Sequence, residues 1–280
     1  MPDLVLGTAQ WGVSYGITNQ HGRLSDADVA VIVADAEHAG VTAIDTALAY
    51  GDAQVRVAPF AERFWVSTKV AGAGDVAEQV GLCLEQLQVT SLDAVMLHDW
   101  DALDDSARAS AVRVLGELAS EGVIERVGVS TYGASGVDAA VSVFASLDAV
   151  LGIVQVPANA IDRRLDSCRS LNVLSAQGCV VQVRSAFLQG LLAGHGGGEL
   201  GLSPDVLAWR DWALQQPGGL VGAALAHVTA LPWASQVVVG AASMDEWAEV
   251  CAAWTSVVAQ RAPEHLASTD EVLLDPRRWV

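Results

Sequence analysis

Eight short apolar runs recur along the chain, and their spacing is the feature that most limits its fold. Each run is rich in β-branched residues, is apolar almost without interruption, and is followed by a longer stretch with helical periodicity. Strands that are buried on both faces of a parallel sheet have this pattern. The runs cover residues 4–8, 42–47, 64–70, 92–98, 125–131, 153–159, 179–186 and 236–241.

The stretches between these runs carry helix start and stop signals. Ser25 is a candidate N-cap, and two helical patterns close at Gly40 and Gly122, where a helix C-terminus favours glycine. Eight strand–helix alternations predict an α/β fold, the (β/α)8 TIM barrel, as one domain over residues 1–280. A doubly wound sheet is the main alternative, but it favours a G-x-G-x-x-G turn after its first strand, and this chain has GTAQWG there.

Composition limits the partners of such a domain. The formal net charge is −18, whereas nucleic acids and anionic membranes bind basic surfaces, so we expect neither as a partner. We find no signal peptide and no apolar run long enough to span a membrane. The four cysteines form no C-x-x-C pair, which predicts buried thiols in a reduced, cytoplasmic protein and no metal site. The oligomeric state is left open.

Four titratable residues lie at or just after the ends of three consecutive predicted strands. Asp45 lies near the end of the second run, Tyr50 lies in the loop after it, Lys69 is near the end of the third run, and His98 ends the fourth. Active sites of barrels lie at the C-terminal ends of the strands, so we expect these side chains to converge. Each residue taken alone also fits a turn, a packing position or the core.

The chemistry of the four side chains is that of a proton donor for a developing oxyanion. A tyrosine has a pKa of about 10, which is too high for an efficient proton donor at neutral pH. A neighbouring ammonium lowers that pKa, and a carboxylate beside the ammonium keeps it charged. A neutral imidazole can orient a carbonyl oxygen. The set therefore suits carbonyl reduction by a bound hydride donor.

The motifs around these residues resemble those of the aldo-keto reductase superfamily over nearly the whole chain. They are LGTAQWG (6–12), IDTALAYGDAQ (44–54), STKV (67–70), MLHDW (96–100), GVSTYG (128–133) and VQVPAN (154–159). Two further stretches resemble a bacterial branch often linked to surface-sugar or natural-product pathways, VRSAFLQGLL (183–192) and LDPRRW (274–279). The resemblance implies a (β/α)8 barrel that reduces an aldehyde or ketone, a small-molecule carbonyl substrate, with NADPH or NADH.

The resemblance also assigns a role to each matching residue. It makes Tyr50 the proton donor, Lys69 and Asp45 the residues that tune it, and His98 the residue that orients the carbonyl. Ser130 and Gln155 are expected to hold the nicotinamide carboxamide. The other expected cofactor contacts are Arg184, where many members stack a tyrosine on the nicotinamide, and Ser185, Gly240, Ala241 and Ser243 along the phosphates.

Several positions depart from the family pattern. Thr131 replaces the usual asparagine after the fifth-strand serine, and Gln54 replaces the usual acidic residue after Tyr50. Glu246 and Val250 occupy positions where arginine and asparagine are common. A carboxylate repels the 2′-phosphate of NADPH, so the usual clamp for that phosphate is not evident, and the choice between NADPH and NADH stays open.

Other interpretations stay open at the level of sequence. The barrel could be a non-catalytic protein that binds a nicotinamide nucleotide or serves as a scaffold, or a lyase that uses Lys69 as a Schiff-base nucleophile. The insert 194–204 either contacts a ligand or is a surface loop. Trp11 and Trp100 either form an apolar wall for a substrate or belong to ordinary packing.

Overall fold

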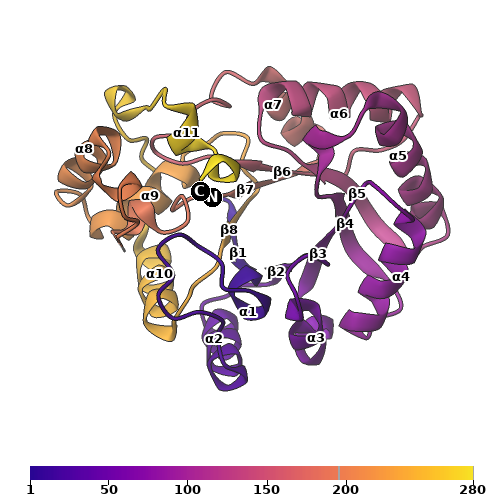
Figure 1. The fold of residues 1–280 in the computed structure, drawn as a ribbon, viewed down its shortest axis with the longest axis horizontal. Helices are drawn as coiled ribbons and strands as arrows, with labels where there is room; N and C mark the ends of the chain where they lie inside the picture. Colours follow the sequence, from indigo (N-terminus) through magenta and orange to yellow (C-terminus); the bar gives the residue numbers. More distant parts are fainter. Residues whose placement is uncertain (195, 280) are drawn as a thin grey trace.

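The eight apolar runs form the eight parallel strands of one closed barrel, in which β8 pairs with β1 (Figure 1). This computed structural model describes residues 1–194 and 196–279. The (β/α)8 prediction is confirmed. The strands are β1 (Asp3–Gly7), β2 (Ala43–Asp45), β3 (Trp65–Val70), β4 (Leu92–Leu97), β5 (Ile124–Ser130), β6 (Ile153–Pro157), β7 (Val180–Arg184) and β8 (Gln236–Val239).

Helices follow the strands and surround the barrel (Figure 1). The Ser25 cap is confirmed, since its hydroxyl accepts from the Asp28 N–H while the Asp28 carboxylate accepts from the Ser25 N–H. The helices are α1 (Ala9–Gly12), α2 (Asp26–His38), α3 (Ala53–Val57), α4 (Val76–Leu87), α5 (Asp105–Ser120), α6 (Ala134–Ser146), α7 (Arg169–Ala176), α8 (Pro204–Ala213), α9 (Gly219–Thr229), α10 (Met244–Ser256) and α11 (Glu271–Leu274).

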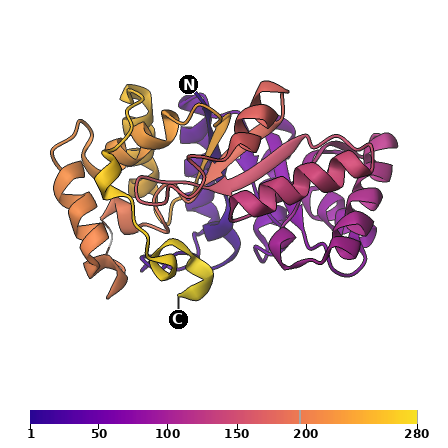
Figure 2. The same cartoon turned by 90° about the horizontal axis from the view of Figure 1, so that it is seen from above.

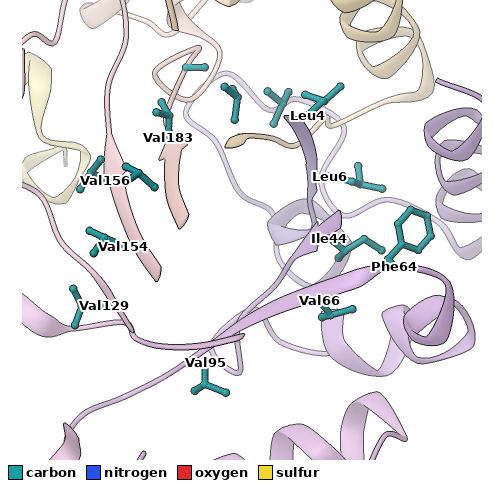
Figure 3. Close-up of a cluster of buried hydrophobic side chains, with 14 of the residues drawn as sticks. Leu4, Leu6, Ile44, Phe64, Val66, Val95, Val129, Val154, Val156 and Val183 are labelled. Carbon is teal, nitrogen blue, oxygen red and sulfur yellow. The ribbon is translucent and has the colours of Figure 1, made fainter. Parts of the chain in front are cut away.

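Alternate residues of each strand face opposite sides of the barrel wall. One set packs against the helices and forms the main hydrophobic core, which includes Ile44, Val66 and Val95 (Figure 3). The intervening residues, such as Asp45 and Ser67, point into the barrel and hydrogen-bond to one another there. The inward positions are therefore mixed: some are polar, whereas Ala94, Met96 and Ile153 form a separate small apolar cluster.

The two chain ends lie at opposite ends of the barrel (Figure 2). The C-terminal tail packs at the end where the strands finish, because the Arg164 guanidinium donates to the Leu274 carbonyl at 3.1 Å and the Arg277 guanidinium stacks 3.7 Å from the Tyr132 ring centroid. No helix of the described residues is long and apolar enough to cross a membrane.

The structure also tests the expectations about the two tryptophans, the four cysteines and the insert 194–204. Trp11 and Trp100 are 1% and 0% exposed, so they belong to the core and form no substrate wall. The prediction that all four cysteines are buried is wrong for Cys251, which is half-buried on α10, whereas the other three are buried. The insert 194–204 contains a short 3-10 turn at Leu200–Leu202, and its residue 195 lies outside the described residues.

Candidate active site

A large cleft opens at the C-terminal ends of the strands, where the sequence predicts the active site. Its empty volume is about 1040 Å³, counted to its open mouth. Asp45, Tyr50 and Gln155 line one part of it, and Gly240 and Glu246 line another. The cleft therefore connects Asp45 and Tyr50 to the β8–α10 segment, whereas Lys69 and His98 do not line it. No described residue of the insert 194–204 lines it either.

The base of this cleft holds a buried ion pair. Lys69 Nζ lies 2.7 Å from Asp45 Oδ1 and 2.6 Å from Asp45 Oδ2, and it donates to the Thr46 carbonyl at 2.9 Å. The two side chains come from adjacent strands, and the residues are only 1% and 3% exposed. An ammonium has three N–H donors, and these three acceptors can take all of them. Lys69 is also the one lysine of the whole sequence.

A chain of amides extends this pair across the barrel. Gln155 Nε2 donates to Asp45 Oδ1 at 2.8 Å and to Gln182 Oε1 at 2.9 Å. Gln182 Nε2 donates in turn to Gln236 Oε1 at 2.8 Å, and Ser67 Oγ donates to Asp45 Oδ1 at 3.0 Å. Buried polar groups need such partners, so the network fixes the orientation of the Asp45 carboxylate.

The sequence analysis did not identify Ser67, Gln182 and Gln236 as part of this network. A signal for them was present, since each is a polar residue within a strand that is otherwise largely apolar. The network also engages the Gln155 amide, which was expected to hold a nicotinamide carboxamide. Ser130, its expected partner, is 4% exposed and lies beside Gln155 in the register of β5 and β6, but it does not line the cleft.

Tyr50 and His98 meet above the ion pair. Their ring centroids are 5.8 Å apart at an interplanar angle of 82°, and Lys69 Nζ lies 5.3 Å from the Tyr50 ring centroid. A side chain on Gly12 would place its Cβ 1.6 Å from the Tyr50 carbonyl oxygen. The turn carrying Tyr50 is therefore packed directly against the backbone of α1, and the structure brings Asp45, Tyr50, Lys69 and His98 together.

The electrostatics differ from expectation in one respect. Burial, followed by the Asp45 carboxylate, raises the pKa of Tyr50 above its ordinary value, and the cation that lowers it is Arg184. The expected lowering of the Tyr50 pKa by Lys69 is not found, whereas Lys69 does lower the pKa of His98. Burial lowers the pKa of Lys69 itself, and Asp45 opposes that effect. Burial also lowers the pKa of His98 to about 3, so its imidazole is neutral at physiological pH, as expected.

The β8–α10 part of the cleft carries acidic side chains. Ser185, Gly240, Glu246 and Glu249 line the cleft, whereas Ala241 and Ser243 do not. Ser243 is the N-cap of α10, and its hydroxyl accepts from the Glu246 N–H at 3.2 Å. Glu246 Oε2 accepts from the Ala242 N–H at 2.7 Å, so this carboxylate already occupies an amide donor before the helix start.

Arg184 is the only cationic side chain among the described residues that line the cleft. It ends β7, is half-buried, and stacks its guanidinium 4.1 Å from the Tyr132 ring centroid. Nη1 donates to Ser185 Oγ at 3.3 Å. The described residues contain no cluster of side chains that could hold a metal ion, in line with the sequence prediction of no metal site, which stays a prediction.

Comparison with known proteins agrees with this arrangement. The sequence model of the Aldo/keto reductase family matches residues 3–270. The chain belongs to the aldo/keto reductase family. This membership supports oxidoreductase function in general, and small-molecule carbonyl compounds as the general substrate class. The cytoplasmic location and the lack of a nucleic-acid partner stay predictions of the sequence.

Solved structures of the family share the fold at low sequence identity. Aldo-keto reductase AKR11C1 from Bacillus halodurans, in its holo form, is 20% identical, with a TM-score of 0.72 over 95% of this chain and 92% of that one. PA4992 of Pseudomonas aeruginosa, assigned as an aldo-keto reductase, is 21% identical, with a TM-score of 0.66 over 90% of each chain. No sequence among the curated proteins matches this chain.

Proposed function

We propose that this member of the aldo/keto reductase family reduces an aldehyde or ketone to an alcohol, with Tyr50 as proton donor and NADH or NADPH as hydride donor. The observation that carries the proposal is the Tyr50–His98 pair above the buried Lys69–Asp45 ion pair, at one end of a long cleft. The cleft extends from Tyr50 at the ends of the strands to Gly240 and Glu246 in the β8–α10 segment, which suits a nucleotide cofactor beside a small substrate.

The bound cofactor supplies the hydride, and the residues of this chain manage the proton. The neutral His98 imidazole donates a hydrogen bond that orients the substrate carbonyl oxygen. Negative charge develops on that oxygen, and the Tyr50 hydroxyl transfers its proton to it. Arg184 lowers the pKa of Tyr50 and so stabilises the phenolate that remains. Lys69 and the amide network hold Asp45 in place beneath the phenol.

The acidic part of the cleft favours NADH over NADPH within this proposal. A nicotinamide beside Tyr50 directs the adenosine of the cofactor toward β8 and α10, where Glu246 and Glu249 line the cleft. Two carboxylates repel the 2′-phosphate of NADPH, whereas a carboxylate accepts hydrogen bonds from the free ribose hydroxyls of NADH. Glu246 has one carboxylate oxygen bonded to Ala242 N–H and a second that is available for this purpose.

Fluorescence titration with NADH and NADPH tests the cofactor assignment. We expect NADH to bind more tightly than NADPH. Glu246→Gln should reduce the ratio of the two dissociation constants by about 10-fold, since it removes one charge that repels the 2′-phosphate. Glutamine keeps an acceptor for the Ala242 N–H. Asp245→Asn is the matched control, because Asp245 is on the same helix but does not line the cleft. Tighter binding of NADPH to the unaltered protein would contradict the preference.

Replacement of Tyr50 by phenylalanine tests the chemistry. We expect kcat for a panel of aldehydes and ketones to fall by about 100- to 10,000-fold, while the dissociation constant of the cofactor changes little. Tyr15→Phe removes a hydroxyl from the same cleft and should keep kcat within about threefold, because Tyr15 is absent from the ion-pair network. Equal activity of Tyr50→Phe and the unaltered protein would remove Tyr50 from the mechanism.

One observation favours the second candidate, a barrel that binds a nicotinamide nucleotide without turnover. Glu246 occupies the Ala242 amide near the start of α10, and Asp45 occupies the Gln155 amide, so two groups expected to hold the cofactor are already paired. Calorimetry separates the candidates. Cofactor binding without oxidation of the reduced cofactor by any carbonyl in the panel supports the second candidate and contradicts the first.

A further inference from the structure

Arg184 has no counter-ion among the described residues, although the chain is rich in carboxylates. The sequence contains 33 acidic and 15 basic side chains. Among the described residues, no carboxylate lies within 4.0 Å of the Arg184 guanidinium. A half-buried guanidinium that is not paired loses hydration without full compensation. Such an arrangement indicates that a ligand supplies the missing negative charge.

The surroundings hold Arg184 in place without neutralising it. Its guanidinium stacks 4.1 Å from the Tyr132 ring centroid, and the Arg277 guanidinium stacks on the same ring at 3.7 Å. Ser185, which accepts a hydrogen bond from Arg184, has a φ of +61°, which is rare for a residue other than glycine. Strain of this kind clusters at ligand sites. The guanidinium is therefore positioned in advance of binding.

Arg184 lies at the reacting end of the cleft. Arg184 and Tyr50 line the same cleft, and the charge of Arg184 lowers the pKa of Tyr50 and that of His98. The other buried cation, Lys69, is already paired with Asp45 and is not available to an anion. The acidic residues of the cleft that have no cationic partner lie at the β8–α10 end. An anionic group next to the reacting carbonyl would meet Arg184 and no competing unpaired carboxylate.

We propose that Arg184 binds the carboxylate of the substrate, so that the enzyme reduces short oxo acids to hydroxy acids. This inference rests on the proposed reductase function. The hydride forms the new C–H bond at the carbonyl carbon and NADH is oxidised to NAD⁺, while the carbonyl oxygen takes the Tyr50 proton. The carboxylate is unchanged and serves only for binding. Its planar geometry matches the guanidinium, which can donate two parallel hydrogen bonds to it.

The first test measures binding and needs no turnover. Oxamate and oxamide have the same shape, but only oxamate carries a carboxylate, and both are titrated by calorimetry into the full-length protein with and without NADH. We expect oxamate to bind at least about 10-fold more tightly, as is usual for a charge-assisted contact. Arg184→Gln should abolish the difference and Arg184→Lys should restore part of it. Arg113→Gln, an exposed arginine on α5, is the matched control.

The second test compares catalysis on acids and esters. For a series of 2-, 3- and 4-oxo acids and their methyl esters, Arg184→Gln should lower kcat/KM for the preferred acid by about 10- to 100-fold more than for its methyl ester, because the ester loses only the effect of Arg184 on Tyr50. The dissociation constant of NADH should rise by a smaller factor than that of oxamate.

Each other outcome has a defined meaning. Equal affinity for oxamate and oxamide in the unaltered protein overturns the carboxylate site even if Arg184→Gln fails to fold. If Arg184→Gln weakens NADH as much as oxamate, the guanidinium serves the cofactor phosphates and the inference is wrong. Reduction of esters as efficiently as acids leaves the reductase function standing and removes this inference. Binding of oxamate through Arg184 with no turnover of any carbonyl keeps the carboxylate site and contradicts the reductase function.

Discussion

Replacement of Asp45 by asparagine removes the counter-ion of Lys69 and preserves the shape of the side chain. The two groups meet at 2.6 and 2.7 Å, and Lys69 is 1% exposed. Removal of one partner of a buried pair costs about 3–5 kcal/mol, because the other charge stays buried without compensation. The free energy of unfolding should therefore fall by this amount at pH 7.

The loss of stability should depend on pH with a defined sign. Without Asp45, burial keeps the pKa of Lys69 below the value of 10.5 that it has in the unfolded chain. The folded variant can avoid the buried charge by releasing the proton of this amine, which costs about 1.36 kcal/mol for each pH unit below 10.5, or about 5 kcal/mol at pH 7 and about 2 kcal/mol at pH 9. Between these pH values the unfolded chain binds more protons, so the stability of the variant rises with pH and the deficit shrinks.

Urea unfolding of both proteins at pH 7, 8 and 9 measures the deficit. Because Lys69 is the one lysine of the sequence, selective ¹⁵N-lysine labelling yields one Nζ resonance that reports its protonation directly. Glu37→Gln is the matched control, since it breaks the exposed pair with Arg63 at 3.0 Å, and it should cost less than about 1 kcal/mol at every pH. A deficit for Asp45→Asn below about 1 kcal/mol at pH 7, or one that does not change with pH, would refute this reasoning.

Two further predictions concern positioning and acid stability. Gly12→Ala should lower both the free energy of unfolding and kcat, because the new Cβ would lie 1.6 Å from the Tyr50 carbonyl oxygen. Gly116→Ala on α5, where the new Cβ meets no atom within 4 Å, should instead add up to about 1 kcal/mol in the same urea titration, and equal effects of both changes would contradict the Tyr50 contact. His227 is 1% exposed, its Nδ1 accepts from the Ala262 N–H at 3.1 Å, and burial lowers its pKa to about 3. Its stabilising contribution is complete above about pH 6.5 and is lost as the pH falls toward 3, so about 2 kcal/mol should disappear between pH 6.5 and 5. His227→Gln should flatten this part of the profile of unfolding free energy against pH, and an unchanged profile would exclude His227 as its source.

The strand order and the mouth of the barrel could be predicted from the sequence because both depend on local patterns. Each of the eight predicted runs matches one observed strand, and the ends agree to within about two residues, as expected for local patterning. The C-terminal ends of parallel strands meet at one end of a barrel, so Asp45, Tyr50, Lys69 and His98 had to lie near one another once the strands were placed.

Family membership could also be predicted from the sequence, but the contacts inside the barrel could not. Membership follows from the sequence, because the family motifs span nearly the whole chain. The partners of the inward side chains do not, because they depend on the register that closes the barrel. Gln155, Gln182 and Gln236 are 27 and 54 residues apart in sequence, yet their amides form one chain.

The electrostatic environment of Tyr50 shows most clearly what the sequence determined and what only the tertiary structure decided. The sequence alone placed Asp45, Tyr50, Lys69 and His98 at one mouth, since strand periodicity and strand ends are local properties. Only the tertiary structure decided that burial and Asp45 raise the pKa of Tyr50 and that Arg184 is the cation that lowers it. The physical reason is that electrostatic effects depend on distance and burial between segments, and a linear pattern specifies neither of them.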